Sequence, residues 1–123
     1  MLNNETIRLL KEYPILRATT QSLQAQIDYK KATGADPTEL ESLNQKLRET
    51  AFILTQLDIG LSALTEEERL ILDKMYIHPV KGMTNLLCNA LEVELATVYR
   101  RRNKALVKLT RALPADNLFP IKN

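Results

Sequence analysis

Cationic side chains gather in one stretch of the sequence that has no acidic residue. Residues 95–113 contain neither Asp nor Glu. Five of its cations lie close together in the sequence, and these are Arg100, Arg101, Arg102, Lys104 and Lys108. Guanidinium and ammonium groups bind phosphate oxygens, and arginine also pairs with base edges, so these residues favour recognition of a nucleic acid. A solvated helix face is the ordinary alternative for such a run, but the apolar positions beside it favour contact with DNA.

The apolar residues around these cations indicate two helices joined by a tight turn. Leu87 and Leu91 lie on one helical face, and Val93 falls in the turn. A second helical face consists of Val98, Ala105, Leu106 and Leu109. A short helix, a turn and a longer basic helix, together spanning residues 84–111, are typical of a helix-turn-helix unit that reads DNA.

The longer helix, over residues 95–112, is predicted to lie in the major groove of double-stranded DNA. Arg100 can donate two hydrogen bonds to guanine and Asn103 can pair with adenine. Leu95 or Ala96 can touch a thymine methyl group. The predicted DNA-binding residues are Thr84, Leu95, Ala96, Thr97, Tyr99, Arg100, Arg101, Arg102, Asn103 and Lys104.

Not all of these cations can face one groove, because successive residues of a helix point in different directions. We assign Arg101, Arg102 and Lys104 mainly to phosphates or to neighbouring carboxylates, where they set affinity and register without reading sequence. Charge is also uneven along the chain. Residues 1–73 carry eight Lys or Arg against twelve Asp or Glu, and residues 74–123 carry nine against three. The second part is thus predicted to face a polyanion, and the first part a different partner.

Residues 1–60 are predicted to form a helical hairpin that binds a partner or makes a dimer. Pro14 should end or kink a first helix, because proline removes an amide donor and disfavours a helical residue before it. A second helical segment then covers residues 14–32. A further helix should start after Asp36, which is followed by Pro37, a residue preset for a first helical turn.

The helix after Asp36 carries a heptad-like row of apolar residues. Asp36 is expected to cap its first turn, Glu39 to bond back to the cap, and Gly60 to break the helix near its end. The row either packs on the preceding segment as an antiparallel hairpin or forms an intermolecular coiled coil, with Phe52 and Ile53 as apolar flanks. Its members are Leu40, Leu43, Leu47, Thr50, Leu54, Leu57, Leu61 and Leu64.

Another helix start is predicted at Thr65, where Thr65 and Glu68 can form a capping box. The helix over residues 66–77 should follow. The glutamates of its first turn do not indicate catalysis, because adjacent residues there point in different directions and have no partner base. A linker follows from His78 to Met83, and His78 is expected to be an ordinary loop residue because no ligand set surrounds it.

Enzyme chemistry is not indicated. The sequence has no Gly-rich phosphate loop, no Ser-His-Asp set and no paired acids, so we expect neither catalysis nor a cofactor. The single Cys88 excludes an intramolecular disulfide, and one Cys with one His argues against structural zinc. No apolar run approaches about 18 residues, so no membrane span is expected. The first residues lack a basic segment followed by an apolar one, so the cytoplasm is the expected compartment.

Two segments resemble the region 4 domains of sigma-70 factors. One comprises residues 64–72 (LTEEERLIL) followed by Met75-Tyr76. The other comprises residues 90–100 (ALEVELATVYR) with residues 104–109 (KALVKL). The likeness covers roughly residues 61–113. Preceded by a helical hairpin in a short chain, it is similar to small phage and prophage regulators of the ArpU and RinA type. The resemblance implies a four-helix carboxyl-terminal domain and control of phage gene transcription.

Position by position, the resemblance places Leu87 at a buried site and Cys88 at a helix crossing, so both are expected in the core. Glu92 departs from the family, which has Gly or Asn in the turn. A side chain at positive φ costs about 1 kcal/mol, so either the turn is strained or it has a different shape. Glu94 replaces the usual Ser or Thr cap, and it would either repel phosphates or accept from a cytosine amino group.

Together these patterns favour an all-α protein with a helical hairpin over 1–60, a region 4-like helix-turn-helix domain over 61–113 and an irregular tail over 114–123. The expected function is a DNA-binding transcriptional regulator of phage type that forms a homodimer through its first helices. One alternative is a protein-interaction module that docks on RNA polymerase or another regulator. The other is an accessory protein for phage DNA packaging or replication.

Overall fold

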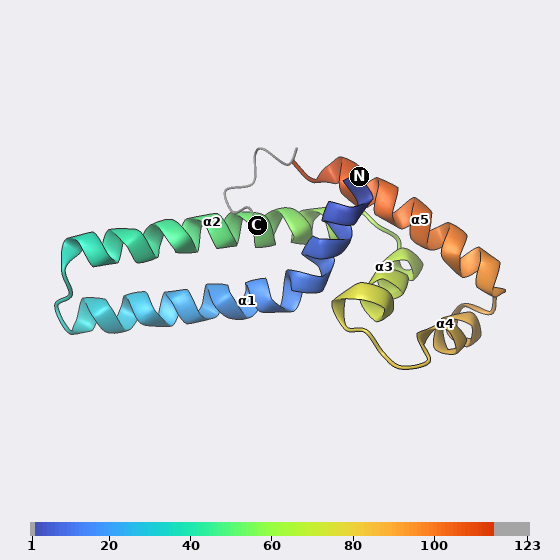
Figure 1. The fold of residues 1–123 in the computed structure, drawn as a ribbon, viewed down its shortest axis with the longest axis horizontal. Coiled ribbons are helices and arrows are strands. Elements are labelled where there is room, and N and C mark those ends of the chain that lie inside the picture. The colour runs from blue at the N-terminus through green and yellow to red at the C-terminus, as the bar shows by residue number, and fades with distance from the viewer. Residues whose placement is uncertain (1, 115–123) are drawn as a thin grey trace.

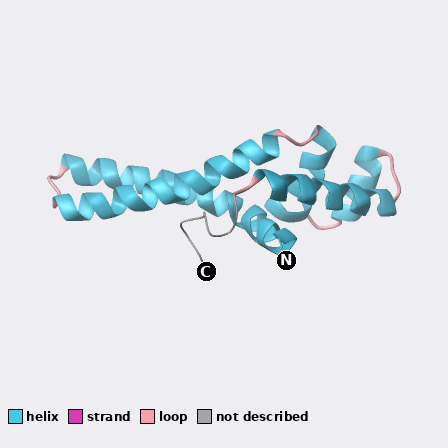
Figure 2. Ribbon diagram, turned by 90° about the horizontal axis from the view of Figure 1, so that it is seen from above, coloured by secondary structure: helices cyan, strands magenta, loops and turns pink. Residues whose placement is uncertain are grey.

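The computed structural model describes residues 2–114, and these residues form helices and no strand, which confirms the predicted all-α class. Helices α1 and α2 lie side by side and antiparallel as a long arm, and the other helices cluster at one end of it (Figures 1 and 2). The predicted tail lies, from residue 115 onward, outside the described part of the chain. The elements are α1 (Leu2–Ala32), α2 (Pro37–Ser62), α3 (Glu66–Leu72), the π-helical turn η1 (Asp73–Ile77), α4 (Met83–Leu91) and α5 (Leu95–Ala112).

Helix α1 runs continuously through Pro14, so of the two outcomes predicted for this proline the structure shows a kink and not a helix end. The helix bends instead (Figure 1), because an interior proline removes one hydrogen bond and crowds the preceding turn. The hydroxyl of Tyr13, beside this proline, donates to Asp58 of α2. Arg17 donates to the Tyr13 hydroxyl at 2.7 Å and to Asp58 at 3.2 Å, so the bend of α1 is tied to α2.

The apolar row of α2 is buried or half-buried throughout, and its middle lies against α1. Ile53 was expected as an exposed flank, but it is buried in a cluster with Leu9 and Leu57. It lies just outside the heptad-like row, and the first half of α1 covers it. The sequence pattern of α2 alone does not reveal that second contact.

The start of α2 is at Pro37, as the sequence indicates, but its predicted capping bonds are absent. The Asp36 side chain accepts no capping hydrogen bond. Glu39 forms an ion pair with Lys30 of α1 and does not bond back to the cap. The charge of Glu39 therefore joins the two helices near the tip of the arm.

Gly60 does not break α2, which continues to Ser62. Gly60 is buried, and a Cβ built on it would lie 2.5 Å from Cδ1 of Leu109 in α5. Any larger residue would need α5 or its side chain to move. The glycine thus permits α2 and α5 to approach closely, which explains its position better than helix termination does.

The first turns of α1 belong to the core that surrounds α5. Leu10 is fully buried in one cluster with Leu72 of α3 and Leu106 of α5. Thr6 and Thr110 share a hydrogen bond of 2.6 Å between their hydroxyl groups. The arm is therefore packed against the cluster of shorter helices, and the predicted boundary at residues 60 and 61 falls inside α2.

Helix α3 begins with the predicted capping box. The amide of Glu68 donates to the Thr65 hydroxyl at 3.1 Å, and the amide of Thr65 donates to the Glu68 carboxylate at 2.9 Å. The chain is helical over residues 66–77, as predicted, but it changes from α-helix to the π-turn η1 after Leu72. His78 closes this turn, because its amide donates to the Asp73 carbonyl and its Nδ1 lies 2.7 Å from the Asp73 carboxylate.

None of the helices described within residues 2–114 has the length and apolar character needed to cross a membrane.

Candidate nucleic-acid interface

A three-residue turn, residues 92–94, joins α4 to α5. Glu92 has φ 56° and ψ 45°, in the left-handed region, and among residues 2–114 it is the one non-glycine residue with positive φ. The amides of Glu92 and Val93 both bond to the Cys88 carbonyl and so close α4. The turn therefore keeps the left-handed shape that usually takes glycine, and Glu92 carries the strain.

Glu94 occupies the N-cap position of α5 in an extended conformation. Its backbone carbonyl accepts from the amides of Thr97 and Val98, but its side chain makes no capping hydrogen bond. This agrees with the expectation that glutamate is a weak cap. The Glu94 carboxylate is exposed at the amino-terminal end of α5, on the same turn as Glu92.

The inner face of α5 holds the helix on the rest of the protein. Val98 is fully buried with Leu87 of α4 and Ile71 of α3. Cys88 is half-buried and packs against this cluster, so it contributes to the core from its edge. The predicted buried positions farther along α5 are confirmed, and they are Ala105, Leu106 and Leu109.

The outer face of α5 points into solvent and is cationic. We use this name for the exposed residues that recur every three or four positions on the side opposite Val98. Within residues 2–114, no hydrogen bond or ion pair is found for the side chains of Arg100, Lys104 or Arg111. The outer face consists of Ala96, Arg100, Asn103, Lys104, Val107 and Arg111.

Two other cations of α5 are bound to the first turn of α3. Arg101 Nη1 lies 3.0 Å from Glu67 Oε1, and Lys108 Nζ lies 3.0 Å from Glu68 Oε1. Of the two assignments predicted for Arg101, the structure shows the neighbouring carboxylate. These pairs fix one flank of α5 against α3. The unpaired cations of α5 therefore lie on its outer face.

The Lys108–Glu68 pair is partly buried and has a structural role. The Glu68 side chain is 7% exposed. Burial alone would raise the pKa of this carboxyl, but the Thr65 amide and the Lys108 ammonium bond to the charged form, and together they hold the pKa below its ordinary value. Lys108 is therefore an ion-pair partner of α3 in this structure.

The opposite flank of α5 carries Arg102, Tyr99 and Asn103. The guanidinium of Arg102 lies over the Tyr99 ring, 4.8 Å from its centre, and Arg102 Nε donates to Asn103 Oδ1 at 3.0 Å. This bond uses one of the two lone pairs of the Asn103 oxygen. The side chain can still donate through its nitrogen and accept through its second lone pair, as pairing with adenine requires.

The outer face holds four of the ten predicted site residues, namely Ala96, Arg100, Asn103 and Lys104. Leu95 is 43% exposed in the first turn of α5, beside the outer face. Thr84 and Thr97 are half-buried, and Arg101 and Arg102 are engaged within the protein. Sequence reasoning missed Val107 and Arg111, although their spacing of seven and eleven residues from Arg100 places them on the same face.

These features define a pair of helices joined by a strained acidic turn, the second helix presenting a cationic face. No protein-family model, no curated protein and no solved structure matches this chain. The described residues also hold no group of three or more His, Cys, Asp or Glu that could bind a metal ion. Function must be inferred from the geometry of α4, α5 and their turn.

Proposed function

We propose that this protein binds double-stranded DNA with α5 in the major groove and regulates transcription, in the manner that its resemblance to sigma-70 region 4 and small phage regulators implies. The observation that carries the proposal is the outer face of α5, where Arg100, Lys104 and Arg111 are exposed and unpaired among the described residues. Neither Asp nor Glu occurs anywhere in this helix.

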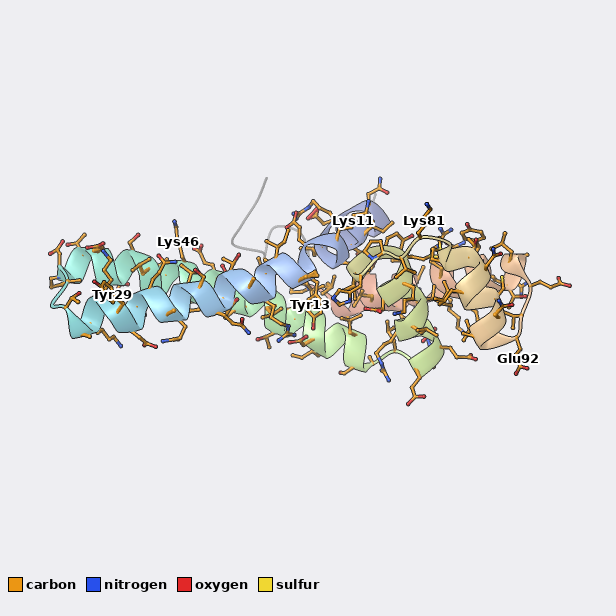
Figure 3. The ribbon with its side chains drawn as sticks, turned by 90° about the horizontal axis from the view of Figure 1, so that it is seen from below. Lys11, Tyr13, Tyr29, Lys46, Lys81 and Glu92 are labelled. Carbon is orange, nitrogen blue, oxygen red and sulfur yellow. The ribbon has the colours of Figure 1, made fainter. Side chains whose placement is uncertain are left out.

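The size of the helix agrees with this proposal. An α-helix with its side chains is about 10–12 Å across, and the major groove is about 12 Å wide. The turn projects at the end of the molecule farthest from the arm, where Glu92 points away from the body (Figure 3). A duplex can therefore approach α5 without first meeting α1 or α2.

Within this proposal the residues of the outer face, together with Leu95 in the first turn of α5, either read bases or bind phosphates. Arg100 reads guanine through its two donors, and Leu95 and Ala96 contact thymine methyl groups. Lys104 binds a phosphate and sets affinity without reading sequence. Asn103 pairs with adenine through its amide nitrogen and the remaining lone pair of its oxygen, while Arg102 holds the side chain in place.

The two glutamates of the turn shape specificity. Glu94 has no capping bond, so its carboxylate is available to accept from a cytosine amino group. Glu92 is exposed beside it and repels backbone phosphates. Together they lower the affinity for DNA of arbitrary sequence more than the affinity for a site that satisfies Glu94.

The second candidate function is docking on RNA polymerase or another regulator. The observation that favours it is the arm, where Ile15, Tyr29 and Ile59 are exposed although they are large and apolar. In the DNA-binding proposal the same arm supports a homodimer, so that a two-fold protein binds a two-fold site. A packaging or replication accessory would bind DNA without changing transcription.

Sequence selection from a random duplex pool, followed by affinity measurements, tests the proposal. We expect Arg100→Ala to weaken binding to the selected site by roughly 1–3 kcal/mol and to relax preference at one base pair. Lys104→Ala should weaken all sequences alike. Lys46→Ala is the charge-matched control, because Lys46 lies on the arm, far from Glu92 (Figure 3). Equal, sequence-blind losses for Arg100→Ala and Lys104→Ala would overturn the role of Arg100, and no enrichment of any site would overturn sequence-specific binding.

A further inference from the structure

Val107 is an apolar side chain left exposed in the middle of a cationic surface. It is 40% exposed, whereas Ala105, Leu106 and Leu109 around it in the sequence are buried. Counting back from Val107 by four, three and four residues gives Asn103, Arg100 and Ala96. Four residues at these intervals lie in one row along a helix.

The cations on either side of Val107 along the outer face indicate what Val107 contacts. Lys104 lies one turn before it and Arg111 one turn after it, and both are exposed and unpaired among residues 2–114. An apolar protein surface would have to desolvate both cations in order to reach the valine. The major groove suits the arrangement better, because phosphates flank it and thymine methyl groups project into it.

We infer that the DNA-contacting surface of α5 extends over nearly the whole helix, with Val107 against a thymine methyl group and Arg111 on a backbone phosphate. This inference rests on the proposed function and adds the orientation of the helix, which lies lengthwise in the groove. At a rise of about 1.5 Å per residue, the row from Ala96 to Val107 is roughly 16 Å long. Helices that lie along the groove read bases with such a row, whereas a helix inserted by its end uses its first turns.

The flanks of the carboxyl-terminal half of α5 are already occupied, which restricts DNA to the outer face. Lys108 is paired with Glu68 of α3, and Thr110 is bonded to Thr6 of α1. The acidic turn of α3 would repel phosphate on its side. Among residues 2–114, Val107 and Arg111 thus point into the sector around this part of α5 that is both exposed and cationic.

Replacing thymine by uracil tests the Val107 contact, because the change removes only the base methyl group. On the site selected by the wild-type protein, each thymine is replaced in turn. We expect one position at which uracil weakens wild-type binding about fourfold, the factor that corresponds to about 0.8 kcal/mol for one buried methyl-sized group. Val107→Ala should bind the thymine site about as weakly and be indifferent to uracil at that position. Lys46→Ala, which shortens an exposed side chain away from the proposed contact, is the control.

Salt dependence tests the Arg111 contact. Arg111→Ala should reduce the slope of log affinity against log salt by about 0.9, equally for selected and unselected DNA, and Lys46→Ala should not. Val107, Arg111 and Lys46 are all exposed, so their alanine variants should unfold at the wild-type temperature, which a thermal melt verifies.

The lengthwise orientation of α5 and the proposed DNA-binding function are contradicted by different results. If Val107→Ala keeps the full uracil effect at every thymine and Arg111→Ala keeps the wild-type salt slope, the lengthwise orientation is wrong even though Arg100→Ala still weakens selected DNA. If the wild-type protein enriches no site and binds no duplex, the proposed function fails, and this inference fails with it.

Discussion

The strained turn at Glu92 gives a prediction that depends on backbone geometry and not on the identity of the ligand. Glu92 has φ 56° and ψ 45°, and its exposed side chain makes no hydrogen bond or ion pair within residues 2–114. Replacing it by glycine removes the clash between Cβ and the backbone without removing a contact. We therefore expect Glu92→Gly to stabilise the protein.

The size of this effect follows from two opposing terms. A side chain in the left-handed region costs about 1–2 kcal/mol relative to glycine. Glycine also gives the unfolded chain more freedom, which opposes the gain by roughly 0.4–1 kcal/mol. The net stabilisation should be about 0.5–1 kcal/mol, or a rise in unfolding temperature of roughly 2–5 °C for a chain of this size.

Chemical denaturation of Glu92→Gly, Glu92→Gln and the wild-type protein measures this effect. Glu92→Gln removes the charge and keeps the strain, so its stability should equal that of the wild type within about 0.5 kcal/mol. Both variants should bind random-sequence DNA more tightly, because both remove a negative charge near the phosphates. A gain in stability from Gln as large as that from Gly would show that charge and not strain is relieved. No gain from Gly would refute the strain argument.

Three further predictions follow from contacts that position α5. Leu10→Ala should destabilise the whole protein by about 2–5 kcal/mol in a single denaturation transition, because Leu10 is fully buried beside α5; a separate early transition of the arm would contradict this. The ionised Glu68 carboxylate should contribute fully to the free energy of unfolding above its ordinary pKa of 4.5, and this contribution should be lost as pH falls through its lowered pKa. The denaturation midpoints of the wild type and Glu68→Gln should therefore converge in acid. A difference that stays constant with pH would refute the pairing. Glu67→Gln should release Arg101 to bind a phosphate and should steepen the slope of log affinity for DNA against log salt by about 0.9. Glu66→Gln makes the same charge change and should leave that slope as in the wild type. Equal slopes for the two variants would show that Arg101 does not move from Glu67 to a phosphate.

Local sequence signals predicted the elements of this fold well. The capping box at Thr65 and Glu68 and the extent of α5 are confirmed, because capping and helical periodicity depend on residues within one or two turns. The inner face of α5 was predicted from its apolar spacing alone. The left-handed turn at Glu92 is one of the two shapes that the comparison with the family's usual Gly or Asn left open.

The parts that were wrong depend on contacts between distant segments. Gly60 was expected to end a helix, but its meaning lies in Leu109, 49 residues later in the chain. For Pro14 the sequence left a helix end and a kink open, and the kink is found because packing on both sides holds the two halves of α1 together. Ile53 is buried by Leu9, which no pattern within α2 indicates.

In the candidate site, too, the sequence predicted what depends on local spacing and did not predict what depends on distant contacts. Sequence spacing located the cationic helix and the inward direction of Val98, but it did not separate Arg101 and Lys108 from the free cations. That separation depends on the placement of Glu67 and Glu68, which α3 brings beside α5 through tertiary packing. The predicted site did not include Arg111 and Val107, because a helix-turn-helix pattern places base contacts in the first turns of its second helix.

The most direct test of the central claim is a salt titration of binding to a random-sequence duplex, with the mass of the complex measured in parallel. We predict a steep linear decrease of log affinity with log salt, a slope reduced by about 0.9 in Lys104→Ala, and no change in Lys46→Ala. The mass will show whether one or two chains bind. Absence of binding at low salt, or equal slopes for the wild type and Lys104→Ala, would contradict DNA recognition by the outer face of α5, and the search would then turn to a protein partner of the arm.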